Sequence, residues 1–223
     1  MRSSAQGKLK RMMDVIISGA AMIVLCPLLA LVALAVRVSM GSPVLFRQTR
    51  PGYRATPFTL LKFRTLTDAR DAEGNLLPDP HRLTPQGNFL RRWGLDELPQ
   101  LWNVFKGEMS LVGPRPLLTE YLEKYTPEQA RRHDVKPGMT GWAQVHGRQD
   151  LLFSKRFEMD VWYVDHWSFI LDLKLILATL LRLHKLSAAG ANPDVDKTDD
   201  LGLFALIRKE QNKAAPIKPS QIP

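Results

Sequence analysis

The stretch VIISGAAMIVLCPLLALVALAV, residues 15–36, decides how the chain folds, because its 22 residues include no charged side chain. A continuous helix of that length measures about 33 Å, roughly the thickness of the hydrocarbon core of a bilayer. The run is long for a cleavable signal peptide, and Arg37 follows it without an Ala-x-Ala cleavage pattern. We therefore expect this segment to remain in the protein and to contact a membrane.

Pro27, which follows Cys26, lies near the middle of this stretch. Proline removes a backbone donor and clashes with the preceding turn, so the helix is expected to kink or break there. Basic residues flank the stretch on both sides and no acidic residue occurs from position 15 to 65, which is typical of two cytoplasmic ends. The residues alone leave two readings open, a kinked spanning helix and a re-entrant hairpin with halves of about 18 and 15 Å.

Short local patterns after this stretch predict an α/β protein that is mainly helical. Residues 44–48 and 58–63 are expected to form a small β-hairpin with a turn at Pro51 and Gly52. The polar segment 67–87 is expected on the surface, followed by a helix near 88–93.

Two further patterns predict helix boundaries. Leu98, Leu101, Trp102 and Phe105 have the spacing of one apolar helix face, and Gly107 supplies a stop. The segment 126–129, with sequence TPEQ, has the pattern of a capping box.

The segment 160–186 combines aromatic residues with a Leu/Ile-rich run. Asp172 and Lys174 interrupt that run, so a second membrane span is not expected. An amphipathic helix at the membrane interface and an ordinary core helix both fit this pattern. The predicted organisation is a re-entrant membrane helix with basic flanks (1–40), a cytoplasmic catalytic core with interfacial helices (41–186) and a C-terminal tail (187–223).

The composition restricts the classes of function. The formal net charge of +9 over 223 residues indicates an anionic partner, which can be nucleic acid, an acidic membrane surface or a phosphorylated small molecule. With Cys26 as its single cysteine, the chain can form neither an internal disulfide nor a cysteine-based metal cluster. The P-loop and nucleophile-elbow motifs are also absent.

Asp96 and Glu97 stand side by side in WGLDELPQLW, residues 93–102. Pro99 fits only the first turn of a helix, so the pair is expected at a helix N-terminus, where the helix dipole favours negative charge. The cations expected around the pair are Lys62 and Arg64 at the end of a strand, Arg91 just before the pair, and Arg115 in the stiff GPRP turn.

Arginine forks beside a helix N-terminus suit a diphosphate, because they neutralise charge that moves during transfer. A carboxylate among these cations would have a lowered pKa and stay ionised, available as a nucleophile or a Mg²⁺ ligand. The alternative is that the acids only cap a helix while the basic residues contact lipid headgroups.

Four strings carry a resemblance to a known family: LLKFRTL (60–66), LRRWGLDELPQLWNVFKGEMSLVGPRPLLTEY (90–121), VKPGMTGWAQVHGR (135–148) and FEMDVWYVDHWSFILDLKLI (157–176). Over about residues 9–186 the chain resembles the bacterial sugar transferase family, in particular its small monotopic phosphoglycosyltransferases. The resemblance favours the re-entrant hairpin, broken here at Cys26 and Pro27 where the family favours Ser-Pro.

The resemblance implies transfer of a phosphosugar from a UDP-sugar to polyprenyl (undecaprenyl) phosphate, giving polyprenyl diphosphate sugar and UMP with Mg²⁺ as cofactor. This is the first membrane step of glycoconjugate assembly, as in exopolysaccharide or lipopolysaccharide synthesis. It implies a monotopic protein on the cytoplasmic face of the bacterial inner membrane, in contact with anionic lipids and not with nucleic acid, and it leaves a homodimer open. Competing interpretations are a membrane-anchored module that binds nucleic acid or anionic lipid, and a scaffold without activity.

By the same resemblance, Asp96 is the nucleophile of a ping-pong reaction through a covalent phosphosugar intermediate and also a metal ligand, with Glu97 assisting. The residues expected to bind substrate or phosphate are Lys62, Arg64, Arg91, Arg115, Gln144, Arg148 and Asp160.

Overall fold

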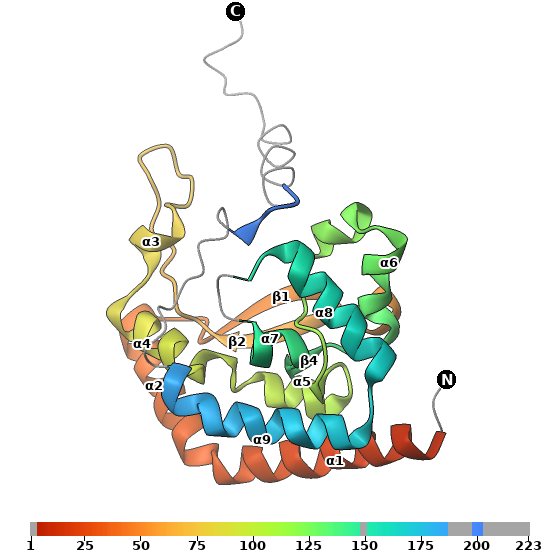
Figure 1. Cartoon of the computed structure of the whole chain (residues 1–223). Coiled ribbons are helices and arrows are strands. Elements are labelled where there is room, and N and C mark those ends of the chain that lie inside the picture. The colour runs from red at the N-terminus through yellow and green to blue at the C-terminus, as the bar shows by residue number, and fades with distance from the viewer. Residues whose placement is uncertain (1–3, 148–150, 187–197, 203–223) are drawn as a thin grey trace, which may run out of the picture.

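The computed structural model describes residues 4–147, 151–186 and 198–202, which form a mainly helical protein with two small sheets (Figure 1). The helices are α1 Ser4–Val24, α2 Cys26–Met40, α3 Asp79–Arg82, α4 Pro85–Trp93, α5 Gln100–Lys106, α6 Pro127–Ala130, α7 Trp142–His146, α8 Phe153–His166 and α9 Phe169–Leu186. The strands are β1 Leu45–Pro51, β2 Pro57–Phe63, β3 Ser110–Val112 and β4 Gly138–Thr140, and the 3-10 turns are η1 Tyr53–Ala55, η2 Leu95–Glu97, η3 Thr119–Lys124 and η4 Arg131–Asp134.

The apolar stretch forms α1 and α2, which are bent by 64° relative to each other. The break lies at Leu25, slightly before the position predicted, because Cys26 and Pro27 occupy the first turn of α2, where proline costs no hydrogen bond. In the described part of the chain no single helix is long and apolar enough to cross a membrane, whereas this bent pair meets the length and composition test when taken together.

Helix α1 turns its polar side inward. Lys10, Asp14 and Ser18 are four residues apart and therefore form one stripe along the helix. Asp14 is buried and accepts hydrogen bonds from the Ser110 hydroxyl at 3.1 Å and from the Leu111 amide at 3.0 Å. The opposite side of α1 leaves apolar side chains exposed. This arrangement reverses that of a helix on the surface of a soluble protein, whose apolar stripe faces the core.

The predicted hairpin is confirmed. β1 and β2 pair antiparallel, from Leu45 opposite Phe63 to Pro51 opposite Pro57, with the η1 turn between them. Phe63 packs beneath α2, whereas Phe58 joins the main core with α5. The second sheet is parallel and joins β3 to β4.

The apolar residues of α5 divide between two faces instead of forming the single face that was expected. Leu101 and Val104 are buried in the main core, while Trp102 and Phe105 stack on each other outside it at 5.8 Å. Both faces of this helix are apolar, so the spacing of its residues did not identify the buried one. The predicted stop at Gly107 is confirmed.

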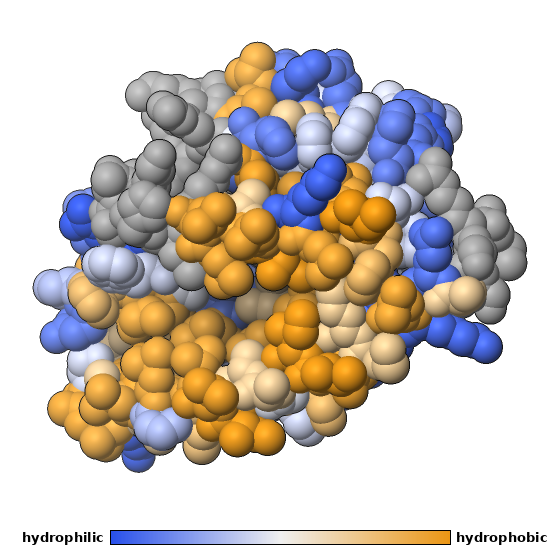
Figure 2. Space-filling model, turned by 60° about the horizontal axis from the view of Figure 1, so that its bottom comes forward, coloured by the Kyte–Doolittle hydropathy of each residue, from blue (hydrophilic) through white to orange (hydrophobic). Residues whose placement is uncertain are grey.

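The segment 160–186 spans two helices, since α8 ends at His166 and α9 begins at Phe169. Helix α9 buries Asp172 and Leu175 against the core and runs beside α1 (Figure 1). Its outer face is nevertheless apolar. Helix α9 therefore has features of both helix types that the sequence left open, a core helix and an amphipathic helix with an exposed apolar face. Figure 2 shows that exposed apolar side chains cover much of this side of the molecule. We call this the apolar surface; it includes Met12, Ile16, Ile23 and Val24 of α1, Leu31, Leu34 and Val38 of α2, Phe89 and Trp93 of α4, Trp102 and Phe105 of α5, and Ile170, Leu173, Leu177, Leu180 and Leu181 of α9.

Candidate active site

The acidic pair lies in the 3-10 turn η2, between α4 and α5. Gly94 ends α4 with φ 65°, a left-handed conformation that glycine adopts without strain. Pro99 precedes the first residue of α5, so Asp96 and Glu97 belong to a separate turn and not to the first turn of α5 as predicted. Hydrogen bonds from the Glu97 and Leu98 amides back to Gly94 and Leu95 hold this turn.

Glu97 holds two cations. Its Oε1 lies 2.8 Å from Lys62 Nζ and 2.5 Å from Arg115 Nη2, and its Oε2 lies 3.4 Å from Arg115 Nη1. Burial favours the neutral form of Glu97, but the charges of Arg115 and Lys62 and their hydrogen bonds outweigh it and hold the pKa of Glu97 well below its usual range. Glu97 is therefore an ionised anchor for two basic side chains.

Asp96 is in a different environment although it is the next residue. Only 7% of it is exposed, and within the described ranges it makes neither a side-chain hydrogen bond nor an ion pair. Burial and then the charge of Glu97 raise the pKa of Asp96, against the opposing influence of Lys62, Arg115 and Arg91. The expected ionised carboxylate with a lowered pKa is thus Glu97, and Asp96 is the carboxylate whose oxygens remain available.

The other predicted cations differ in what they contact. Arg91 lies within electrostatic reach of Asp96, and its Nε donates to Thr65 Oγ1 at 2.9 Å. Arg64 is buried and turns away to the end of α2, where it donates to backbone carbonyls of Met40, Ser42 and Leu66. Arg64 therefore fastens the hairpin to the end of α2.

Arg115 is positioned by the close approach of the GPRP turn to β4. A Cβ atom on Gly113 would lie 2.3 Å from the Lys136 carbonyl oxygen, so only glycine fits there. The Arg115 carbonyl accepts a hydrogen bond from Arg132 Nη2 at 2.8 Å. Arg132 is also paired with Asp160, 2.7 Å away, and both side chains are almost fully buried. Asp160 thus reaches the site only through Arg132, a residue that sequence reasoning missed.

The structure places Gln144 in α7, where both atoms of its side-chain amide are buried without a hydrogen-bond partner in the described part of the chain. Unpaired buried amides are uncommon, so this side chain has unused hydrogen-bonding capacity. Arg148 lies outside the described residues.

The predicted residues that the structure brings together are Asp96, Glu97, Lys62, Arg91 and Arg115. This set offers one carboxylate with available oxygens beside three cations, an arrangement suited to a nucleophile acting on a phosphate. Within the described residues, no three His, Cys, Asp or Glu side chains converge as a complete metal site. One carboxylate does fit Mg²⁺ in phosphoryl-transfer sites, since substrate phosphates and water supply the remaining ligands there.

Known proteins resemble this chain over most of its length. The family model described as bacterial sugar transferase matches residues 5–185. The uncharacterized sugar transferase EpsL of Bacillus subtilis (strain 168) is 56% identical over 178 residues, which cover 78% of this chain and 87% of that protein. The UDP-glucose:undecaprenyl-phosphate glucose-1-phosphate transferase of Caulobacter vibrioides is 40% identical over 181 residues, covering 77% of this chain and 68% of that protein.

A protein of the same name from Escherichia coli (strain K12) is 40% identical over 184 residues, covering 78% of this chain but only 40% of its own length. The matched region includes the acidic turn, the hairpin and the bent helix pair. The chain belongs to the bacterial sugar transferase family.

Proposed function

We propose that the protein transfers a sugar 1-phosphate from a UDP-sugar to undecaprenyl phosphate. The observation that carries this proposal is Asp96, a buried carboxylate with no partner among the described residues, beside the cluster that Glu97 forms with Lys62 and Arg115. The names of the relatives in Caulobacter vibrioides and Escherichia coli support the substrate classes.

In the first step, an Asp96 carboxylate oxygen attacks the phosphorus next to the sugar. A bond from this phosphorus to Asp96 forms while its bond to the bridging oxygen breaks, and the electron pair leaves with UMP. Lys62, Arg91 and Arg115 neutralise the phosphate charge during this displacement. Glu97 keeps two of these cations in place, which is a positioning role.

In the second step, a phosphate oxygen of undecaprenyl phosphate attacks the same phosphorus. The bond to Asp96 breaks, the carboxylate is regenerated, and the polyprenyl diphosphate sugar leaves. Mg²⁺ bound by Asp96 and the donor phosphates would supply further charge neutralisation. The two steps allow one site to receive a water-soluble donor and a lipid-bound acceptor in turn.

The membrane placement that we propose follows from the apolar surface. Trp93 and Trp102, which are about half exposed, lie immediately on either side of the segment that carries the acidic turn. Tryptophan favours the headgroup region, which is also where the phosphate of the acceptor lies. In this placement α1 and α2 enter and leave by the cytoplasmic face, and their basic flanks contact anionic lipids.

The test measures UMP release from a panel of UDP-sugars in the presence of undecaprenyl phosphate. Without acceptor, a donor labelled in its sugar-side phosphate should label the wild-type protein. The Asp96→Asn variant should lose both signals, whereas the exposed Asp79→Asn should retain them. Normal UMP release by Asp96→Asn overturns the nucleophile assignment, and no UMP release from any UDP-sugar by the wild type overturns the function.

A further inference from the structure

Two arginines outside the predicted site are partly buried without an acidic partner. Arg50 of β1 donates from Nη2 to Gln48 Oε1 at 2.7 Å, but its Nε is buried and has no hydrogen-bond partner in the described residues. Arg156 of α8 donates to the Leu151 carbonyl at 3.3 Å, and its guanidinium lies over the Phe153 ring. Within the described ranges neither arginine forms an ion pair.

The two arginines are also repelled by the site itself. Burial lowers the pKa of Arg50, and the positive charge of Arg115 lowers it further. Burial likewise lowers the pKa of Arg156; Asp160 opposes this effect, whereas Arg115 adds to it. Glu120 and Asp160 offset this effect through space, but in the described part of the chain neither forms an ion pair with Arg50 or Arg156. Cations that are partly desolvated without a directly paired acid destabilise a fold, and a bound anion reduces that cost.

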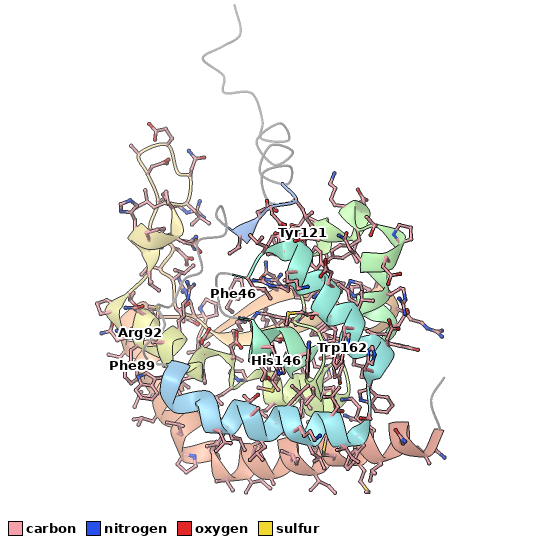
Figure 3. The ribbon with its side chains drawn as sticks, viewed as in Figure 1. Phe46, Phe89, Arg92, Tyr121, His146 and Trp162 are labelled. Atoms are coloured by element: carbon pink, nitrogen blue, oxygen red, sulfur yellow. The ribbon has the colours of Figure 1, made fainter. Side chains whose placement is uncertain are left out.

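Tyr121 of η3 adds a hydrogen-bond donor at the same place. Its ring is 3% exposed, and its hydroxyl makes no hydrogen bond to any described residue. Burial raises the pKa of Tyr121 to about 12, so the hydroxyl keeps its proton at neutral pH, and both Arg50 and Arg156 lie within its electrostatic reach. Figure 3 shows Tyr121 on the side of the hairpin away from α9.

The strand register connects this group to the acidic turn. Phe46 lies opposite Lys62 and Arg50 lies opposite Phe58, so Arg50 and Lys62 project from the same face of the hairpin. Four residues along a strand separate the two positions by about 13 Å. Arg115 contacts Glu97 beside Lys62 and lies within electrostatic reach of Arg50. Positive charge therefore extends from the acidic turn toward Arg50.

We propose that Arg50, Arg156 and Tyr121 form an anion subsite that binds the phosphate of the leaving nucleoside monophosphate. This inference rests on the proposed function. In that reaction, negative charge develops on the leaving phosphate, on the side of the transferred group opposite the attacking carboxylate. Arg115 contacts Glu97 and lies within electrostatic reach of both additional arginines, and the Phe153 ring contacts both Tyr121 and Arg156, so the three groups extend the phosphate-binding region of the site.

The test measures binding of UMP and of uridine to the full-length protein in lipid nanodiscs. Arg50→Gln and Arg156→Gln should each weaken UMP binding by about tenfold or more, because each removes a charged phosphate contact. Tyr121→Phe should weaken it by a few fold. Uridine binding should not change in any of these variants. The matched controls are Arg47→Gln on the opposite face of β1 and Lys155→Gln on the exposed side of α8, which should bind UMP as the wild type does.

Unchanged UMP binding in Arg50→Gln and Arg156→Gln overturns the subsite, and so does an equal loss of UMP and uridine binding. If a variant binds UMP normally but no longer discriminates between UDP-glucuronate and UDP-glucose, the arginines contact the sugar, and the phosphate subsite is rejected.

Thermal unfolding without ligand shows whether a variant loses UMP binding because its fold is damaged. Removing a repelled cation should not lower the melting temperature. If the wild type is labelled on Asp96 but the variants bind UMP normally, the result rejects the subsite and leaves the proposed transfer reaction intact. If the wild type binds UMP through these arginines but forms no phosphosugar adduct on Asp96, the result rejects the proposed transfer reaction and leaves the subsite intact.

Discussion

Asp96 and Glu97 are neighbours in the sequence, but their surroundings drive their pKa values in opposite directions. Glu97 has both oxygens engaged by Lys62 and Arg115, whereas Asp96 is buried with no described partner. A residue kept charged but unpaired costs stability, and such residues are concentrated at functional sites. The division of roles proposed for the pair follows from this difference.

The first prediction is that Asp96→Asn stabilises the protein while it abolishes transfer. Because folding raises the pKa of Asp96, the fold favours its protonated form, and the cost of ionisation develops as the pH rises past the usual carboxyl pKa and is complete above the folded pKa. Asparagine removes that charge. At pH 7.5 the melting temperature should rise by about 2–4 °C, which corresponds to roughly 1 kcal/mol for a chain of this size. The gain should shrink as the pH falls and the wild-type Asp96 becomes protonated.

Glu97→Gln is the matched control, and it should have the opposite effect. Folding lowers the pKa of Glu97, so its contribution to stability is present above the usual carboxyl pKa and is lost as the pH falls through the folded value. At pH 7.5 this variant should therefore melt at a lower temperature than the wild type. A lower melting temperature for Asp96→Asn would contradict the assignment of Asp96 as the unpaired carboxylate.

At the scale of elements, local patterns were predictable and distant partners were not. The hairpin and the capping box at Thr126 are confirmed, because each depends on a few consecutive residues. The inward polar stripe of α1 was not visible, because its partners on β3 and α9 lie about a hundred residues or more away in the sequence. Arg132 was missed for the same reason, since its acid is 28 residues further along.

The acidic pair itself was predicted, because its carboxylates and three cations lie in motifs that are recognisable in the sequence. The difference between the surroundings of the two carboxylates was not predicted, because it depends on which carboxylate the folded chain turns toward Arg115. Arg50 was not predicted either: it is one of several basic residues that follow the apolar stretch, and only the register with β2 places it on the same face as Lys62.

The second prediction concerns α8 and the turn that carries Arg115. Asp160→Asn leaves the buried charge of Arg132 without a counter-ion among the described residues, while the Tyr125 hydroxyl and the Arg115 carbonyl still accept its hydrogen bonds. Breaking a buried ion pair in this way costs about 3–5 kcal/mol, measurable by chemical denaturation. Asp165→Asn is the matched control on the same helix: its ion pair with Arg131 is exposed to solvent, so its loss should cost much less than the loss of the buried pair. Equal effects of the two variants would contradict the role of Asp160 as a buried support.

At the scale of the whole molecule, one side is apolar (Figure 2), and the exposed apolar side chains include Trp93 and Trp102, which precede and follow the acidic turn in the sequence. Five helices contribute to this surface, and α1 places its own polar side chains inward to leave apolar ones outside. Exposed apolar patches of this extent indicate a contact with a membrane or a protein. The basic flanks of the bent pair favour a membrane with anionic lipids.

The last prediction separates membrane attachment from the first chemical step. Replacing Ile16 of α1 and Leu177 of α9 by Glu removes two exposed apolar side chains, each worth about 2 kcal/mol when transferred from water to an apolar medium, so binding to anionic vesicles should fall at least tenfold. Labelling of Asp96 by a soluble donor should persist, while transfer to acceptor in vesicles should fall with binding. Leu76→Glu is the control, because Leu76 is also an exposed leucine but lies in the polar segment before α3. Full vesicle binding by the double variant would show that this side of the molecule faces something other than the bilayer.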